Sequence, residues 1–209
     1  MGRPPAAPGG GACPGWSEDR PASAGATVLS AQDRQDLERI FREHGTEDFR
    51  WLPAADITVA QWVRMKCQYG CDEYGKNVAC PPNNPPVADC ERFMREYTQA
   101  VIFHFVKAAP DQAARRQWSR QINERLLALE RAVFLHGHHK AFMLLMGSCP
   151  LCEHCAGNPA DCPHPGSARP TAEGLAVDLF ATAHRAGYPL EVLADRSRPM
   201  TRYAILLIE

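Results

Sequence analysis

The number and spacing of the cysteines most constrain what this chain can fold into. There are nine cysteines in 209 residues, and eight of them form two groups of four. The first group consists of Cys67, Cys71, Cys80 and Cys90, and the second of Cys149, Cys152, Cys155 and Cys162. Four thiolates are the ligand set of a tetrahedral zinc ion or of an iron–sulfur cluster. The spacing therefore predicts two metal-binding loops.

The second group has the tighter spacing. Cys149, Cys152 and Cys155 follow one another at steps of three residues, and Cys162 is followed directly by Pro163. Bacterial ferredoxins bind four-iron clusters through a C-x2-C-x2-C run whose last cysteine is also followed by proline. The gap before Cys162 is longer than in that pattern, and zinc sites more often use two separate C-x2-C pairs. We therefore favour an iron–sulfur cluster here and keep zinc as the alternative.

The first group is spaced more loosely and begins in a stretch, residues 67–86, that is rich in Gly, Asn and Pro. Gly70 and Gly75 permit backbone conformations with positive φ, in which amide groups can turn toward cluster sulfurs. Cys90 falls on a predicted helix, so a buried apolar cysteine explains it as well as a metal ligand does. The spacing predicts a second metal site in which the role of Cys90 stays open.

Disulfide bonds are an alternative use of these cysteines, and three observations argue against them. Their number is odd, the first residues lack the apolar core of a secretory signal, and a chain of 209 residues can hold a core without cross-links. We therefore expect metal-binding thiols in a cytoplasmic protein. His136, His138 and His139 form another cluster, but they follow a long predicted helix, where such side chains complement the terminal carbonyl groups.

The N-terminal segment differs in composition from the rest of the chain. Residues 1–30 are dominated by Gly, Pro, Ala and Ser and cannot bury enough apolar surface to offset the entropy of ordering. We expect a disordered tail, with Cys13 as a bystander, followed by a single Cys-rich metal-binding domain over residues 31–209. The net charge of −1 gives no broad attraction to nucleic acid. No run of about 18 apolar residues is present, so membrane insertion is not expected.

Apolar periodicity and turn residues give the expected order of elements. We expect helices over residues 32–44, 58–66, 87–97, 112–136 and 172–186, and strands over residues 100–106, 141–146, 189–194 and 202–208. A long helix joins the first two strands and predicts parallel neighbours with a right-handed crossover, whereas the last two strands predict an antiparallel pair. The fold class is therefore α/β, with α+β as the alternative. We expect a mixed sheet of about four strands with helices packed on it and two Cys-rich metal-binding loops.

The two cysteine groups are expected to lie at one edge of the sheet. Cys149 directly follows the strand predicted over residues 141–146. The helix predicted over residues 87–97 is about 17 Å long at 1.5 Å per residue, so it can pack back along the next strand. The loop before that helix would then lie at the same end of the sheet as Cys149. Ligand sites favour this edge in α/β sheets.

Several segments resemble the bacterial and archaeal predicted metal-binding proteins of domain-of-unknown-function family 2284. These segments are KCQYGCDEYGKNVACPPNNPP, Cys90 before a helix that contains Tyr97, GSCPLCEHC with a later cysteine, and RPTAEGLAVD. The resemblance covers about Asp56 to Glu209 and leaves the Gly/Pro/Ala-rich tail outside. It implies metal or iron–sulfur binding through the eight grouped cysteines, with Cys90 as the less secure one. It does not supply a settled reaction.

Three functions remain open at this point. The leading hypothesis is a cytoplasmic protein with one or two [4Fe-4S] clusters, which acts in electron transfer or as a redox accessory to a partner enzyme and so has a redox partner protein. The first alternative is a zinc-binding structural or interaction module. The second is an enzyme whose open cluster site binds substrate, if Cys90 is not a ligand. Catalytic residues are not identified, because the sequence has no Gly-rich phosphate loop, nucleophile elbow or H-E-x-x-H motif.

Overall fold

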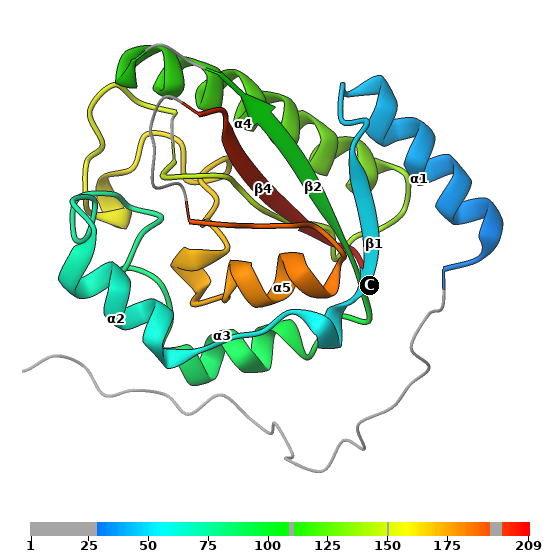
Figure 1. Ribbon diagram of the computed structural model, residues 1–209, viewed down its shortest axis with the longest axis horizontal. Coiled ribbons are helices and arrows are strands. Elements are labelled where there is room, and N and C mark those ends of the chain that lie inside the picture. Colours follow the sequence, from blue (N-terminus) through cyan, green and yellow to red (C-terminus); the bar gives the residue numbers. More distant parts are fainter. Residues whose placement is uncertain (1–28, 109–110, 150, 193–197) are drawn as a thin grey trace, which may run out of the picture.

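A sheet with helices on both faces forms the centre of the molecule (Figure 1). The structure is a computed structural model that describes residues 29–108, 111–149, 151–192 and 198–209. The disordered tail expected over residues 1–30 therefore lies almost wholly outside the described residues, as does Cys13. Within the described ranges, no helix is both long and apolar enough to cross a lipid bilayer.

Four antiparallel strands make up the sheet. In spatial order they are β1 (Phe49–Pro53), β2 (Gln99–Lys107), β4 (Met200–Leu207) and β3 (Phe142–Leu144). Ala100 of β2 lies opposite Leu207 of β4, which in turn lies opposite Phe142 of β3. The prediction of a mixed α/β fold with about four strands and helices packed on the sheet is confirmed.

The pairing of the strands differs from the prediction. β2 and β3 run in the same direction, but β4 lies between them, so the expected parallel neighbours do not exist. Rules about consecutive strands could not anticipate a C-terminal strand that inserts between two earlier ones. The strand expected over residues 189–194 does not form in its described part, residues 189–192. The fourth place is taken by β1, which the prediction missed because only Leu52 among its five residues is buried.

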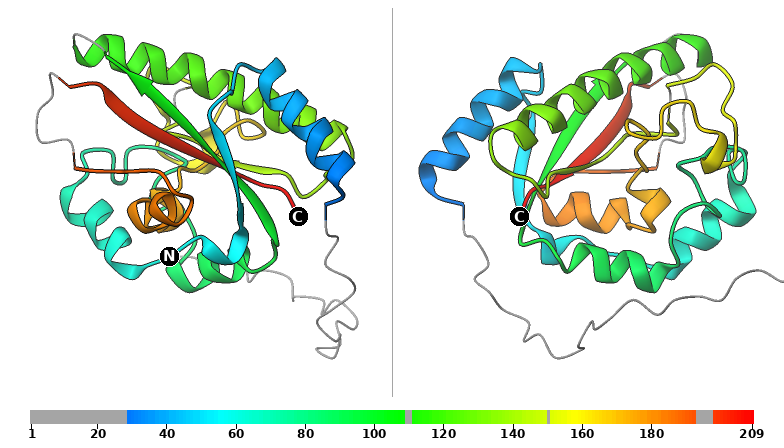
Figure 2. Two further views of the ribbon diagram at one scale, coloured as in Figure 1. Left: turned by 45° about the vertical axis from the view of Figure 1, so that its right-hand side comes forward. Right: turned by 180° about the vertical axis from the view of Figure 1, so that it is seen from behind.

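Helices α1 (Ala31–Glu43) and α4 (Gln112–Leu135) cover one face of the sheet (Figure 2). The Asp111 side chain accepts a hydrogen bond from the amide of Ala114 and so caps the start of α4. The helix predicted over residues 112–136 is thus confirmed. Its buried apolar stripe consists of Ile122, Leu126, Leu129 and Val133.

The other face carries α2 (Gln61–Gly70), α3 (Val87–Met94) and α5 (Leu179–Arg185), with the short 3-10 helices η1 (Ala54–Asp56), η2 (Pro159–Asp161) and η3 (Glu173–Leu175) in the connections. The single helix expected over residues 172–186 is divided into η3 and α5. Ala176 adopts a left-handed conformation with φ of 61°, and the Asp178 side chain then caps a new helix by accepting from the amide of Ala181. α2 extends beyond its predicted end, so Cys67 lies on a helix and not in a loop.

Both faces of the central strands are buried. On β2, Val101 and Phe103 face α1 and α4, whereas Ala100 and Ile102 face the opposite layer. A strand that is covered on both sides needs apolar residues at every position, which explains why the run over residues 100–106 was recognisable in the sequence. The long loops that carry the cysteines leave this core at one end of the sheet, on the left in Figure 1.

Candidate metal centre

The second cysteine group lies on one irregular loop between β3 and η3. All four of its thiols line the same small hollow of about 10 Å³, together with Val78 from the other cysteine loop. Burial raises the pKa of the Cys149 thiol, an amide hydrogen bond from Leu151 lowers it, and the neighbouring Cys155, Cys162 and Cys152 raise it further. The four side chains therefore surround one space and interact electrostatically.

The size of that hollow limits what fits without rearrangement. About 10 Å³ is the room that a single water molecule needs. Among the residues that the structure describes, no three His, Cys, Asp or Glu side chains are placed to share one metal ion. The eight described cysteines are all free thiols. As a donor set, four thiols suit soft metals and iron–sulfur clusters, and a ligand larger than one ion requires the loop to open.

In the first group, three of the four cysteines lie near enough to influence one another's charge, although among the described residues they are not placed to share one metal ion. Cys67 lies on the last turns of α2, Cys71 directly follows the helix, and Cys80 lies in the loop beyond it. Burial raises the pKa of Cys80 to about 11, and nearby Cys71 and Cys67 contribute to the rise. The Cys67 Sγ is 3.9 Å from the carbonyl oxygen of Glu173, and the Cys80 Sγ is 3.9 Å from the Ser148 hydroxyl.

Cys90 occupies a different environment from the other three. It lies on α3, is 1% exposed and belongs to the apolar core beneath the sheet. Its Sγ is 3.5 Å from the carbonyl oxygen of Pro85 and 4.0 Å from an Arg64 guanidinium nitrogen. Burial is the main cause of its raised pKa, and Arg64 lowers it. The structure thus groups Cys90 with the core, which is one of the two roles that the sequence left open.

The two cysteine loops are in direct contact. The backbone amide of Val78 donates to the Cys155 Sγ at 3.3 Å, and the Asn77 side chain donates to the carbonyl oxygen of Cys149 at 3.3 Å. A third bond runs from the Asn83 side chain to the carbonyl oxygen of Gly157 at 2.9 Å. The two cysteine loops therefore meet at one end of the sheet, as the sequence analysis expected, but Cys90 of the first group lies apart from them in the core.

Comparison with known proteins adds the class of the molecule. The model of a family described as "Predicted metal-binding protein (DUF2284)" matches residues 50–208, which include all eight grouped cysteines. The chain belongs to this family. The resemblance noted from the sequence is thereby confirmed, and with it the coarse class of predicted metal-binding proteins. No curated protein and no solved structure matches the chain.

Within the family segment, two polar groups have buried roles that the sequence analysis did not identify, one between the cysteine loops and one between the second loop and α4. Asn77 is 4% exposed, and its side chain accepts from the amide of Ala79 while it donates to the second loop. Arg169 forms an ion pair of 2.7 Å with Glu130 of α4, whose carboxylate also accepts from the amide of Met143 in β3. Arg169 and Glu130 are 39 residues apart, so no local pattern could reveal the pair.

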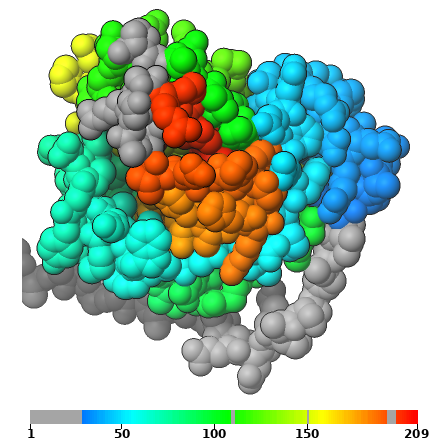
Figure 3. Space-filling view, in the orientation of Figure 1, coloured from blue at the N-terminus to red at the C-terminus, as the bar shows by residue number. Residues whose placement is uncertain are grey.

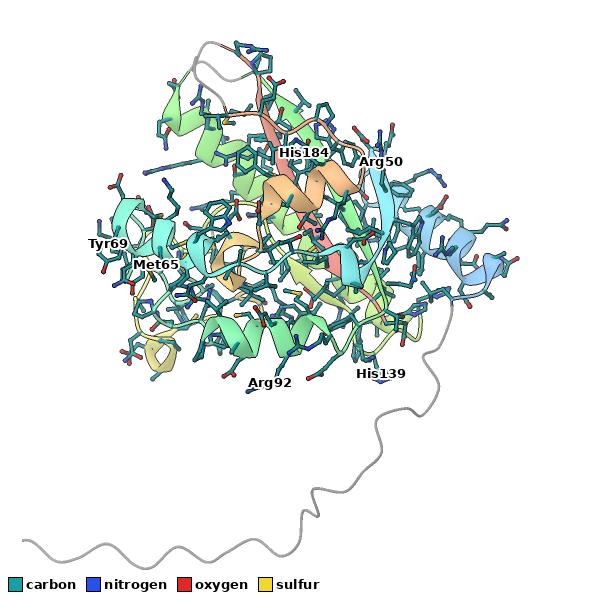
Figure 4. The ribbon with its side chains drawn as sticks, turned by 60° about the horizontal axis from the view of Figure 1, so that its bottom comes forward. Arg50, Met65, Tyr69, Arg92, His139 and His184 are labelled. Atoms are coloured by element: carbon teal, nitrogen blue, oxygen red, sulfur yellow. The ribbon has the colours of Figure 1, made fainter. Side chains whose placement is uncertain are left out.

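The histidine cluster that the sequence singled out lies away from the cysteine loops, and the aromatic residue Tyr69 near the first group lies in solvent. His136 caps the C-terminus of α4, and the Nδ1 of the buried His138 is 3.4 Å from a Glu209 carboxylate oxygen. The helical-cap interpretation therefore fits His136, whereas the side chain of His138 pairs with a carboxylate instead. Tyr69 is 81% exposed and points outward from α2 beside Met65, so it does not shield the first group (Figure 4).

A basic cleft of about 960 Å³ adjoins the second group. It lies between the first turns of α4 and the cysteine loops, and Cys149, Cys152 and Cys155 form part of its wall. Five cationic side chains line it, those of Lys76, Arg115, Arg116, Arg120 and Arg202. Two carboxylates also line it, those of Glu73 and Glu153. Positive charge at this wall stabilises thiolates and any anionic group that they hold.

Proposed function

We propose that this protein carries a [4Fe-4S] cluster on the loop of Cys149, Cys152, Cys155 and Cys162 and transfers electrons to or from a redox partner protein. The observation that carries the proposal is that four thiols of one loop line one hollow beside a basic cleft. A bound cluster would supply one-electron redox chemistry. The compartment that we propose is the cytoplasm, where such thiols stay reduced.

Three features of the chain favour a cluster over a simple ion. Cysteines at steps of three can wrap one side of a cubane, as in ferredoxins. The amide of Val78 donates to the Cys155 Sγ, and such bonds to sulfur stabilise negative charge and tune the potential of a cluster. In its described residues the loop contains only the three-residue helix η2, so it can open with the loss of few helical hydrogen bonds.

The first group supports a second centre of a different kind. Cys67, Cys71 and Cys80 interact with one another, whereas Cys90 is held in the core. Three thiols leave one ligand position for another group, which is the arrangement that an open cluster site would need. The chain therefore offers one complete ligand set and one incomplete set.

A zinc module is the second candidate, and the size of the hollow favours it. A space of about 10 Å³ has room for a single ion, so the loop would have to move less for zinc than for a cluster. Zinc bound to the second group would join the two loops into one interaction surface and would stabilise the fold without redox chemistry.

Anaerobic purification of the full chain, followed by measurement of iron, zinc and acid-labile sulfide, separates these candidates. We expect a coloured protein with about four iron and four sulfide per cluster. A colourless protein that contains zinc but no sulfide would contradict the cluster and support the zinc module. A protein free of iron, zinc and sulfide would contradict both.

A further inference from the structure

A second hollow, of about 530 Å³, lies between α2, the start of α5 and the strand β4. Figure 3 shows the segment after α5 in contact with α2 on one side and with β4 on another, on one face of the molecule. The volume falls within the range of about 300–1,000 Å³ that is typical of small-molecule sites. Apolar and aromatic side chains form most of its wall, and they include Trp62, Leu179, Phe180, Leu190, Met200 and Tyr203. Cys67 and Cys71 line the same hollow.

The exposed edge of β4 forms a polar part of this wall. β3 pairs only with Ile205, Leu206 and Leu207, so in the described part of the chain no strand pairs with residues 200–204 on the side away from β2. Alternate backbone N–H and C=O groups of an antiparallel edge strand face away from its partner. Met200, Thr201 and Tyr203 line the hollow. A ligand there can therefore reach backbone hydrogen-bonding groups as well as apolar side chains.

Tyr203 contributes a fixed aromatic ring to the apolar wall. Its side chain is 3% exposed, and its ring stacks on His104 with the ring centroids 5.0 Å apart. Its hydroxyl oxygen has no hydrogen-bond partner among the described residues, but it is enclosed by protein and is not open to the hollow. The ring of Tyr203, and not its hydroxyl, is therefore the part that a ligand can contact.

The charged side chains of the hollow favour an anionic group at one end. Lys66, Arg115 and Arg202 line it, against the two carboxylates Glu173 and Glu191. Arg202 is exposed, forms no ion pair with the residues that the structure describes, and contacts the Met200 sulfur at 4.0 Å. Arg115 and Arg202 also line the basic cleft, so the two spaces meet at this end. Trp62 and Phe180 line only the apolar hollow.

We propose that this hollow binds a small amphipathic organic anion, with the apolar part of the ligand against Trp62 and Phe180 and its anionic group toward Arg202. The site depends on the cavity and not on the metal, so it stands apart from the proposed function. Its position beside Cys67 and Cys71 nevertheless places a bound ligand next to the incomplete thiol set. A substrate-binding role for that set would follow from the same geometry.

Two fluorescent probes test the proposal. 8-Anilinonaphthalene-1-sulfonate and N-phenyl-1-naphthylamine share their ring system, and only the first carries a sulfonate. Each is titrated onto the full-length protein as purified, and iron is measured in the same sample. We expect saturable binding of the sulfonate probe at one site, and weaker binding of the neutral probe. Arg202→Gln should lower the affinity for the sulfonate probe about tenfold and leave the neutral probe unchanged, because one charge-assisted bond is lost.

Matched variants exclude binding elsewhere on the surface. Phe180→Ser should weaken both probes, whereas Phe134→Ser, at an exposed aromatic residue near the end of α4, should weaken neither. Arg131→Gln removes an exposed cation outside the hollow and should not affect the sulfonate probe. Circular dichroism confirms that each variant is folded. Equal affinities for both probes with no effect of Arg202→Gln, or equal effects of Phe180→Ser and Phe134→Ser, would overturn the proposal. If protein without iron binds the two probes as expected, the proposal of an iron–sulfur cluster is contradicted, but the proposal of an anion-binding hollow is not.

Discussion

The two cysteine groups have the same number of thiols, yet the fold treats them differently. The second group stays on one loop and lines one hollow. The first group is spread over α2, a loop and α3, and only three of its members interact. Cysteines close together in an irregular loop cannot move far apart, because each residue spans at most about 3.6 Å. Cysteines on separate helices are placed by helix packing, which spacing in the sequence does not reveal.

Helix boundaries explain part of this difference in the first group. Cys67 lies on α2, whereas Cys71 is the extended residue that directly follows the helix, so the chain turns away from α2 at this point. Cys90 and Met94 are four residues apart within α3, and the face that they share packs into the core. The regular helix therefore keeps Cys90 in the core, whereas Cys71 lies where α2 has already ended.

Substitution of a ligand on the second loop gives the largest expected effect. Cys152→Ser removes one of the four thiols around the hollow, so the loop should lose nearly all of its bound metal. Metal analysis after anaerobic purification measures this. The first group serves as an internal reference, because its thiols are unchanged. If the variant has the same metal content as the unmodified protein, the second loop does not bind the metal.

The raised pKa of Cys80 predicts that its thiol is alkylated about 100-fold more slowly in the folded protein than in the unfolded protein. Its pKa rises from 9.0 to about 11 because the thiol is buried, and two pKa units correspond to a 100-fold smaller thiolate fraction. In metal-free protein at pH 8, iodoacetamide should therefore modify Cys80 about 100-fold more slowly than in urea-unfolded protein. The neutral thiol is favoured in the folded state, so its contribution to stability is complete below pH 9.0 and is lost as the pH rises through about 11. Mass spectrometry of labelled peptides measures the rates, and equal rates would contradict the buried position.

The contact between the two cysteine loops predicts a loss of stability of intermediate size when its buried hydrogen bonds are removed. Asn77→Ala removes a buried side chain that bonds to Ala79 and to Cys149, and it should lower the free energy of unfolding by about 2 kcal/mol. Asn83→Ala is the matched control, because Asn83 also bonds across the loops but is exposed, and it should cost well under half as much. Urea unfolding of metal-free protein measures both values. Equal losses would indicate that the buried bond of Asn77 is not what joins the loops.

The same contrast explains how much the sequence could predict. The buried strand β2 and the long helix α4 carry apolar patterns that depend on local residues alone, and both were predicted. The place of β4 between β2 and β3 and the pair of Arg169 with Glu130 depend on contacts between distant residues. In the site, cysteine spacing identified the ligand candidates, and the loop contact was expected from the strand ends. Asn77 gave no signal, because a single asparagine in a loop is ordinary.

Cys90→Ala gives the smallest expected effect and tests the comparison most directly. The substitution removes one heavy atom from the core, which should lower the free energy of unfolding by about 1 kcal/mol. The loss stays small because the Arg64 guanidinium keeps its hydrogen bonds to the carbonyl oxygens of Pro85 and Gly174, both at 3.1 Å. Metal content should equal that of the unmodified protein, in contrast to Cys152→Ser. A loss of metal comparable to that of Cys152→Ser would instead make Cys90 a ligand, and α3 would then have to turn its buried face toward the other three thiols.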